Sequence, residues 1–270
     1  MCDNCVKHGE GKKWFLQAKN YSDELLADLR RRRYIQEFFA HQARQVGKAE
    51  PMELLRRVPK LLRPLVDTVI TGRLRRDHFG QVVTLEETRE IVLMVSKVVR
   101  LPCVCRRITL RQERRYCLGF ILSPNSLGAL ELIDPSYWDG PDGPGLEMLT
   151  RAEALTLLEE FNAEGLVHSV WTFKTPFIGG LCNCTPTECR AMLGNLTYDL
   201  TVLHPGESIV RLNRATCLNC GACANRCWFG ALSFDRGARR LELNQAKCYG
   251  CGLCTVTCPT QALDLIPRRW

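Results

Sequence analysis

The sequence predicts an α+β fold in two parts, and two observations support that prediction. Helical patterns dominate residues 1–205, which we expect to form a mainly helical domain bearing eight of the sixteen cysteines. Residues 206–270 contain the other eight cysteines in a tandem repeat, with short alternating segments between the two copies. That part is expected to be a small module of short hairpins and helices, and Pro205-Gly206 marks the boundary.

Three helices are expected in the first half of the chain. Apolar residues interspersed with charges over residues 21–42 predict the first helix. Pro51 predicts the start of the second, because proline fits the first turn of a helix. Thr84 and Glu87 have the spacing of a capping box, which predicts a helix over residues 84–97.

A second capping box and a strand are expected further along. Thr150 and Glu153 predict the start of a helix that Gly165 would end. Residues 166–173 are rich in Val, Trp and Phe and predict a strand. Residues 134–145 consist mostly of turn formers and predict a long loop.

The C-terminal module is expected to contain a strand and a hairpin. Residues 209–212 read as a strand that leads into the first cysteine run. Residues 232–234 and 241–243 alternate apolar and polar side chains, with Asp235-Arg-Gly237 between them. This arrangement predicts a short hairpin.

Sixteen cysteines in 270 residues are the feature of the composition that most needs a reason. Disulfides would require an oxidising compartment, but the first residues contain no apolar stretch of signal-peptide length. The longest apolar run, residues 91–99, is interrupted by Ser96 and Lys97 and is too short to span a bilayer. We therefore expect a cytoplasmic protein whose clustered cysteines bind metal.

The chain is basic. Its formal net charge is +8, and residues 209–270 carry nine Lys or Arg against three Asp or Glu. A basic surface suits an acidic protein, an anionic membrane or a nucleic acid, and solvated helix faces would give the same composition. We expect an acidic docking surface on a redox partner, since a nucleic-acid partner would rest on charge alone.

The tandem repeat consists of two runs of four cysteines with identical spacing. In iron–sulfur proteins with this spacing, three cysteines of one run bind one cluster and the fourth reaches the other cluster. One cluster is then expected on Cys217, Cys220, Cys223 and Cys258, and the other on Cys248, Cys251, Cys254 and Cys227. Zinc is the alternative, although zinc sites usually take two Cys-x-x-Cys pairs.

With this motif, residues 209–266 resemble the bacterial two-[4Fe–4S] ferredoxin family. Pro259 follows Cys258 as in that family, whereas Trp228 follows Cys227 in place of a proline. The resemblance implies a ferredoxin-like dicluster module that binds two [4Fe–4S] clusters and transfers one electron at a time.

Six further cysteines lie in the middle of the chain. They are Cys103, Cys105, Cys117, Cys182, Cys184 and Cys189. Two pairs, Cys103-Val-Cys105 and Cys182-Asn-Cys184, have the i, i+2 spacing that points both side chains the same way in a strand. Two such units could supply four thiolates, so we expect a third iron–sulfur cluster with ligands drawn from the six. Zinc and buried free thiols are the alternatives.

Four other residues are candidates for a role at a metal site. Cys2 and Cys5 form a Cys-x-x-Cys pair near His8 and would be part of a site, although two ligands do not complete one. His168 is interpreted as a hydrogen-bonded core residue, with a ligand or a proton donor as alternatives. Arg106 would either offset the charge of a thiolate cluster or lie at the surface.

The upstream part is similar to a group of poorly characterised ferredoxin-domain proteins of anaerobic bacteria and archaea. The matching elements are Cys103-Val-Cys105-Arg106, Gly165-Leu-Val-His168 and Cys182-Asn-Cys184. The resemblance implies iron–sulfur binding upstream of a dicluster domain, without a named reaction. This chain has only Cys189 after the last element, where those proteins carry a denser cysteine run.

Two functions are compatible with these observations. The first is an iron–sulfur electron-transfer protein or subunit that passes single electrons to a redox partner. The second is an oxidoreductase whose upstream cluster contacts substrate. The sequence has no Gly-x-Gly-x-x-Gly, no phosphate-binding loop and no obvious acid–base pair, so no catalytic residue is assigned and the first function is preferred.

Overall fold

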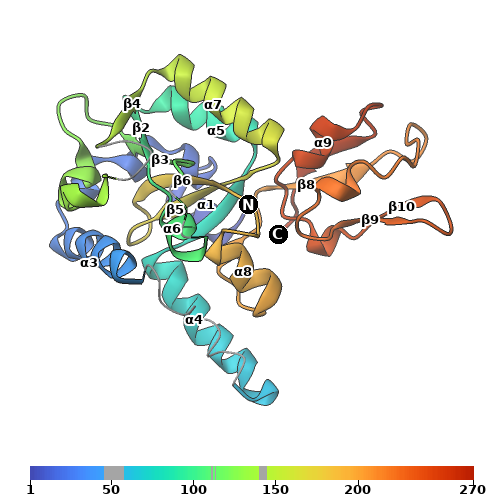
Figure 1. The fold of residues 1–270 in the computed structure, drawn as a ribbon, viewed down its shortest axis with the longest axis horizontal. Coiled ribbons are helices and arrows are strands. Elements are labelled where there is room, and N and C mark those ends of the chain that lie inside the picture. The colour runs from blue at the N-terminus through green and yellow to red at the C-terminus, as the bar shows by residue number, and fades with distance from the viewer. Residues whose placement is uncertain (46–57, 111, 113, 140–144) are drawn as a thin grey trace.

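Two structural parts lie side by side in the computed structural model, which describes residues 1–45, 58–110, 112, 114–139 and 145–270 (Figure 1). The larger part is built on a seven-stranded sheet. The smaller part, at the right of Figure 1, contains two separate two-stranded sheets. No helix among the described residues is long and apolar enough to cross a bilayer.

The large sheet has the strand order β4-β2-β3-β6-β5-β1-β7. Its neighbouring strands pair antiparallel, except that β7 runs parallel to β1. The strands are β1 Gly80–Val83, β2 Lys97–Leu101, β3 Cys117–Ile121, β4 Glu147–Leu149, β5 Val167–Thr172, β6 Ile178–Cys184 and β7 Leu203–His204. Every residue of β5 is buried, so both faces of this strand are covered.

Alternating side chains give the sheet two apolar faces. Val98 and Phe120, which are cross-strand partners, join a core under α5 Leu85–Met94 and α7 Arg151–Glu164. Val99 and Ile121 belong to a second core that includes Ile35 of α3 Leu29–Gln45. Successive residues of a strand point to opposite faces, so α5 and α7 cover one face and α3 the other.

Both predicted capping boxes are present and begin the two helices over the first face. Thr84 and Glu87 start α5, and Thr150 and Glu153 start α7. Helix α7 ends at Gly165, whose φ of 91° is left-handed as a glycine C-cap allows. The remaining α-helices are α1 Asp3–His8, α2 Asp23–Leu26, α4 Arg63–Asp77, α6 Val104–Thr109, α8 Arg190–Thr197 and α9 Leu253–Thr257.

Short 3₁₀ segments connect these elements. They are Trp14–Leu16, Ala18–Tyr21, Lys60–Leu62, Gly128–Leu132, Pro135–Tyr137, Ala224–Arg226 and Gln245–Lys247. The first of them places Trp14 and Phe15, both fully buried, in the core beneath α5 and α7. The N-terminal segment is therefore packed into the larger part of the protein.

The C-terminal part is built from two antiparallel strand pairs. β8 Ser208–Leu212 pairs with β11 Leu263–Pro267, and β9 Leu232–Asp235 pairs with β10 Arg240–Leu243. Leu232, Leu241 and Leu263 share a small core with cysteines of both runs. A core of this size contributes little stability, so bonds from the cysteines to a metal would add to it.

The structure confirms several local predictions and corrects others. The strands at residues 166–173 and 209–212 and the hairpin are present, close to the expected bounds. The helix expected over residues 21–42 is divided, because α2 ends at Leu26 and α3 begins at Leu29. The helix expected at Pro51 and most of the loop tip, residues 140–144, lie outside the described residues.

The prediction of a mainly helical N-terminal part was incomplete. It included one strand, β5, whereas the helices surround a sheet of seven strands. Most of the missed strands are short, and β1 is buried throughout, so it lacks the alternation that reveals a half-buried strand. The α+β class holds, while the domain boundary at residues 205 and 206 stays a prediction.

Candidate metal centres

Each predicted set of four cysteines in the C-terminal part surrounds its own cavity. The first cavity encloses about 320 Å³ of space free of atoms, part of it open to solvent, and its thiols are Cys217, Cys220, Cys223 and Cys258. The second encloses about 340 Å³, and its thiols are Cys227, Cys248, Cys251 and Cys254. In both cavities the fourth cysteine comes from the other run of the repeat, which is the arrangement expected for a pair of cubane clusters.

Backbone N–H groups point at these sulfurs. Ala231 N–H and Leu232 N–H donate to Cys227 Sγ over N···S distances of 3.2 and 3.4 Å. Ala262 N–H makes the corresponding bond to Cys258 Sγ at 3.2 Å, since Ala231 and Ala262 occupy equivalent positions in the repeat. Such donors stabilise negative charge on sulfur, which suits thiolate ligands.

Burial disfavours the thiolate form of several of these cysteines, in contrast to the N–H donors. It raises the pKa of Cys251 to about 12 and that of Cys223 to about 11. These groups would stay protonated at neutral pH without a metal, whereas a coordinated thiol is deprotonated. The donor set, the cavity and the electrostatics therefore fit an iron–sulfur cluster in each cavity.

Residues 210–265 match the family model of the 4Fe-4S dicluster domain. The C-terminal part is a ferredoxin-type dicluster domain. The match spans both cysteine runs and stops short of the upstream cysteines, so it supports iron–sulfur binding without fixing the number of clusters in the chain. No curated protein matches the sequence.

The six upstream cysteines, which are far apart in sequence, gather beside the dicluster domain. Cys103 and Cys105 lie at the start of α6, Cys117 begins β3, Cys182 and Cys184 end β6, and Cys189 precedes α8. Cys117 Sγ lies 3.5 Å from Cys103 Sγ and 3.9 Å from Cys182 Sγ. Cys184 interacts with Cys189, and burial, together with the charge on Cys189, raises the pKa of Cys105 to about 12. Their assignment as metal ligands stays a prediction.

The expectation that both Cys-x-Cys units lie on strands was wrong for one of them. Cys182 and Cys184 lie on a strand as expected, but Cys103 is the N-cap of α6 and Cys105 lies within that helix. The two sulfurs of the Cys103-Val-Cys105 unit therefore do not share a strand face. Cys117, which begins the strand β3, brings its sulfur to Cys103 instead.

Arg106 is a buried residue and not a surface arginine. Its guanidinium pairs with the Glu188 carboxylate and lies 3.9 Å from the centre of the Tyr116 ring. The charges of Glu188, Cys103 and Cys184 counter the effect of burial and hold the Arg106 pKa above its ordinary value. Glu188 went unnoticed in the sequence, where only its position next to Cys189 could have drawn attention.

His168 is a hydrogen-bonded core residue, as interpreted from the sequence. It is fully buried on β5, and its Nδ1 lies 2.6 Å from Asn183 Oδ1. Burial lowers the His168 pKa to about 4, so the ring is neutral at physiological pH. Asn183 is the residue between Cys182 and Cys184, and its amide also donates to Tyr116 O, so this contact helps to hold the Cys182-Asn-Cys184 segment in place.

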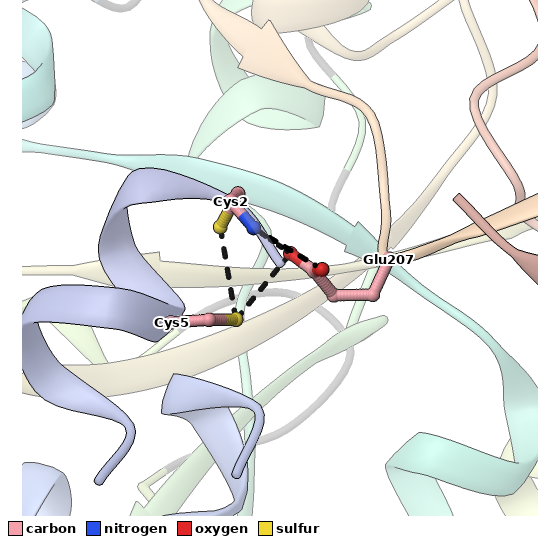
Figure 2. Close-up of side chains that lie close together, drawn as sticks. All are labelled: Cys2, Cys5 and Glu207. Atoms are coloured by element: carbon pink, nitrogen blue, oxygen red, sulfur yellow. Dashed lines mark hydrogen bonds between the residues drawn. The ribbon is translucent and has the colours of Figure 1, made fainter. Parts of the chain in front are cut away.

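Cys2 and Cys5 meet a partner that the sequence did not reveal. Their Sγ atoms lie 3.7 Å apart at the start of α1, and Cys5 Sγ lies 3.3 Å from a carboxylate oxygen of Glu207 (Figure 2). The three potential ligand atoms all lie within 4.8 Å of one another. Glu207 immediately precedes β8, so this group sits where the chain enters the dicluster domain.

Proposed function

We propose that this protein transfers single electrons between iron–sulfur clusters and a redox partner, and that the six upstream cysteines hold a third cluster. The dicluster domain supports the proposed electron transfer, because a bound [4Fe–4S] cluster gains or loses one electron at a time. The third cluster and its place beside the dicluster domain rest on the arrangement of the upstream thiols. Domains at residues 1–205 and 206–270 are part of the same proposal.

The upstream sulfurs as a set are spread more widely than a single zinc ion allows, although Cys117 Sγ lies 3.5 Å from Cys103 Sγ and 3.9 Å from Cys182 Sγ, distances also found around zinc. A tetrahedral zinc site with Zn–S bonds of about 2.3 Å places all its sulfurs about 3.8 Å from one another. Among the described residues, Cys2, Cys5 and Glu207 form the set whose ligand atoms all lie within 4.8 Å, and no three of the upstream cysteines do so. Thiols spread around a wider centre suit a cubane, whose ligands bind different irons.

An apolar core joins the upstream cysteines to the dicluster domain. Cys184 and Cys189 belong to the same buried cluster as Phe229 and Leu253, and Cys251 packs against it. Cys251 lines the second cavity. Electron tunnelling favours short paths through packed protein, so the position of these residues supports a route from the upstream site to the Cys227, Cys248, Cys251 and Cys254 set.

The first cavity offers a place for the partner. Cys220 is exposed, and the neighbouring Leu218 has 67 % of its surface accessible to solvent. Residues 209–270 carry nine Lys or Arg against three Asp or Glu, and this positive balance would attract an acidic protein and speed its association. Electrons would then leave or enter the chain near Cys220.

Metal and sulfide analysis of anaerobically purified protein tests the proposal. Three [4Fe–4S] clusters contain about twelve iron and about twelve sulfide atoms per chain. Replacing Cys182 and Cys184 by serine should lower both to about eight, and a Thr187→Ser control on the adjacent turn should leave them at about twelve. About eight in the unaltered protein would remove the third cluster, and an absence of iron would overturn the whole proposal.

Single Cys→Ser replacements at the six upstream positions would then separate ligands from bystanders. Four replacements that remove the upstream electron paramagnetic resonance signal, and two that do not, would fit a cluster held by four thiolates and a role in electron transfer. If only three of the six replacements removed the signal, one iron would have no protein thiolate. That result would favour the oxidoreductase alternative.

A further inference from the structure

We propose that Cys2, Cys5 and Glu207 bind one tetrahedral divalent metal ion, zinc by the chemistry of the ligands. The proposal is independent of the proposed electron-transfer function. It extends the Cys-x-x-Cys pair by a third ligand that lies about two hundred residues away in sequence. Figure 2 shows the three side chains pointing toward one another from α1 and from the segment before β8.

The distances within the group match a zinc site. Tetrahedral geometry with Zn–S bonds of about 2.3 Å and Zn–O bonds of about 2.1 Å requires S···S near 3.8 Å and S···O near 3.6 Å. The observed Cys2 Sγ–Cys5 Sγ separation is 3.7 Å, and Cys5 Sγ lies 3.3 Å from Glu207 Oε1. Three protein ligands leave the fourth position of the tetrahedron for a water molecule.

Hydrogen-bond donors surround the three side chains. Trp270 Nε1–H donates to Glu207 Oε2 at 2.9 Å, and Trp14 N–H donates to Cys5 Sγ at 3.4 Å. Gln81 Nε2–H donates to Glu207 Oε1 at 3.2 Å, while its Oε1 accepts from Trp14 Nε1–H. Trp14 Nε1 can only donate, so it fixes the Gln81 amide with its NH₂ toward the site. Donors that orient the ligands are the usual second shell of a metal centre.

The site is buried, so a bound cation would supply a positive charge that solvent does not. Cys5 is fully buried, and Cys2 and Glu207 are exposed by 9 % and 6 %. A carboxylate with two thiols in such a place gains a compensating charge if a divalent cation binds. No basic side chain makes an ion pair with Glu207 among the described residues, and the groups that donate hydrogen bonds to its carboxylate are neutral, while the Arg268 charge acts on it without a direct contact.

The position of the group gives the ion a structural role. Glu207 lies between Gly206, whose N–H donates to Tyr249 O, and Ser208, whose carbonyl accepts from Arg268. Arg268 also donates to Cys248 O, next to the second cavity. A metal on Cys2, Cys5 and Glu207 would therefore fasten the N-terminal helix to the start of the dicluster domain.

Zinc K-edge X-ray absorption of anaerobically purified protein tests the site, because it detects zinc without interference from iron. The expected spectrum shows two sulfurs at about 2.3 Å and oxygen or nitrogen at about 2.0–2.2 Å, and elemental analysis of the same sample should give about one zinc per chain. Cys2→Ser with Cys5→Ser, and separately Glu207→Gln, should each lower the zinc content at least tenfold at limiting zinc concentrations. Iron content in these variants should be unchanged.

Glu87→Gln is the matched control, since Glu87 is also a buried carboxylate and glutamine retains its capping box. It should keep the zinc. Four sulfurs around zinc would place the ion in a different cysteine group, and a Cys2–Cys5 disulfide or two freely alkylated thiols without any metal would overturn the proposal. If the unaltered protein contained zinc but no iron, the electron-transfer function would be wrong and the zinc site would stand.

Discussion

The Arg106–Glu188 pair shows how single buried charges organise the proposed upstream site. The two side chains have only 8 % and 6 % of their surface exposed. Glu188 also accepts the Thr185 N–H at 3.1 Å, so it holds the turn between β6 and α8, which carries Cys184 and Cys189. Arg106 fixes the other side of the site, on the helix that contains Cys105.

Glu188→Gln should lower the free energy of unfolding by about 3 kcal/mol, because it leaves the Arg106 charge buried without its partner. Arg89→Gln, which breaks the exposed Arg89–Glu159 pair, should cost at most about 1 kcal/mol. Urea denaturation under anaerobic conditions measures both. Equal losses for the two variants would show that the buried pair has no special role.

At the scale of elements, the two capping boxes differ in their surroundings. Thr84 and Glu87 are buried, and Glu87 forms an ion pair with Lys13 from the N-terminal segment. Thr150 and Glu153 are exposed to solvent. The same sequence motif therefore begins one helix inside the protein and another at its surface.

Thr150→Ala should destabilise the protein by about 1 kcal/mol, the usual cost of losing an N-cap. Thr84→Ala should cost about 2–3 kcal/mol, because the Glu87 N–H that it bonds would be left unpaired in a buried position. The serine variants should stay close to the original protein, since serine keeps the hydroxyl. Thermal or urea unfolding compares them, and a larger loss at Thr150 would contradict the argument.

At the scale of the whole molecule, Trp228 links the dicluster domain to α7. Its Nε1–H donates to Gly165 O at 2.8 Å, and Arg226 donates to Ala163 O at 2.7 Å. A side chain on Gly165 would collide with Arg226 Nη1, so the glycine also makes room for this contact. The residue that departs from the ferredoxin pattern thus serves the contact between the two parts.

Trp228→Pro, which restores the ferredoxin residue, should leave the iron content unchanged and loosen this contact. The expected readout is faster hydrogen exchange at residues 163–168, measured by mass spectrometry. Trp228→Phe retains a ring but loses the donor, so it should give an intermediate effect. Unchanged exchange in the proline variant would show that Trp228 does not fasten the two parts.

The spacing of the cysteines along the chain was enough to predict the dicluster domain. All eight cysteines of that motif lie within two short segments, so their spacing determines which sulfurs meet, and the same local patterns predicted both capping boxes, β5 and the hairpin. The remaining contacts follow from the way the whole chain folds. Cys117 reaches Cys103 and Cys182 because β3 lies between β2 and β6 in the seven-stranded sheet. Glu207 reaches Cys5 and Glu188 reaches Arg106 because helices and loops far apart in sequence pack together. Such contacts depend on burial and strand pairing across the whole chain. The residues involved have no fixed spacing in the sequence, so the sequence does not reveal that they meet.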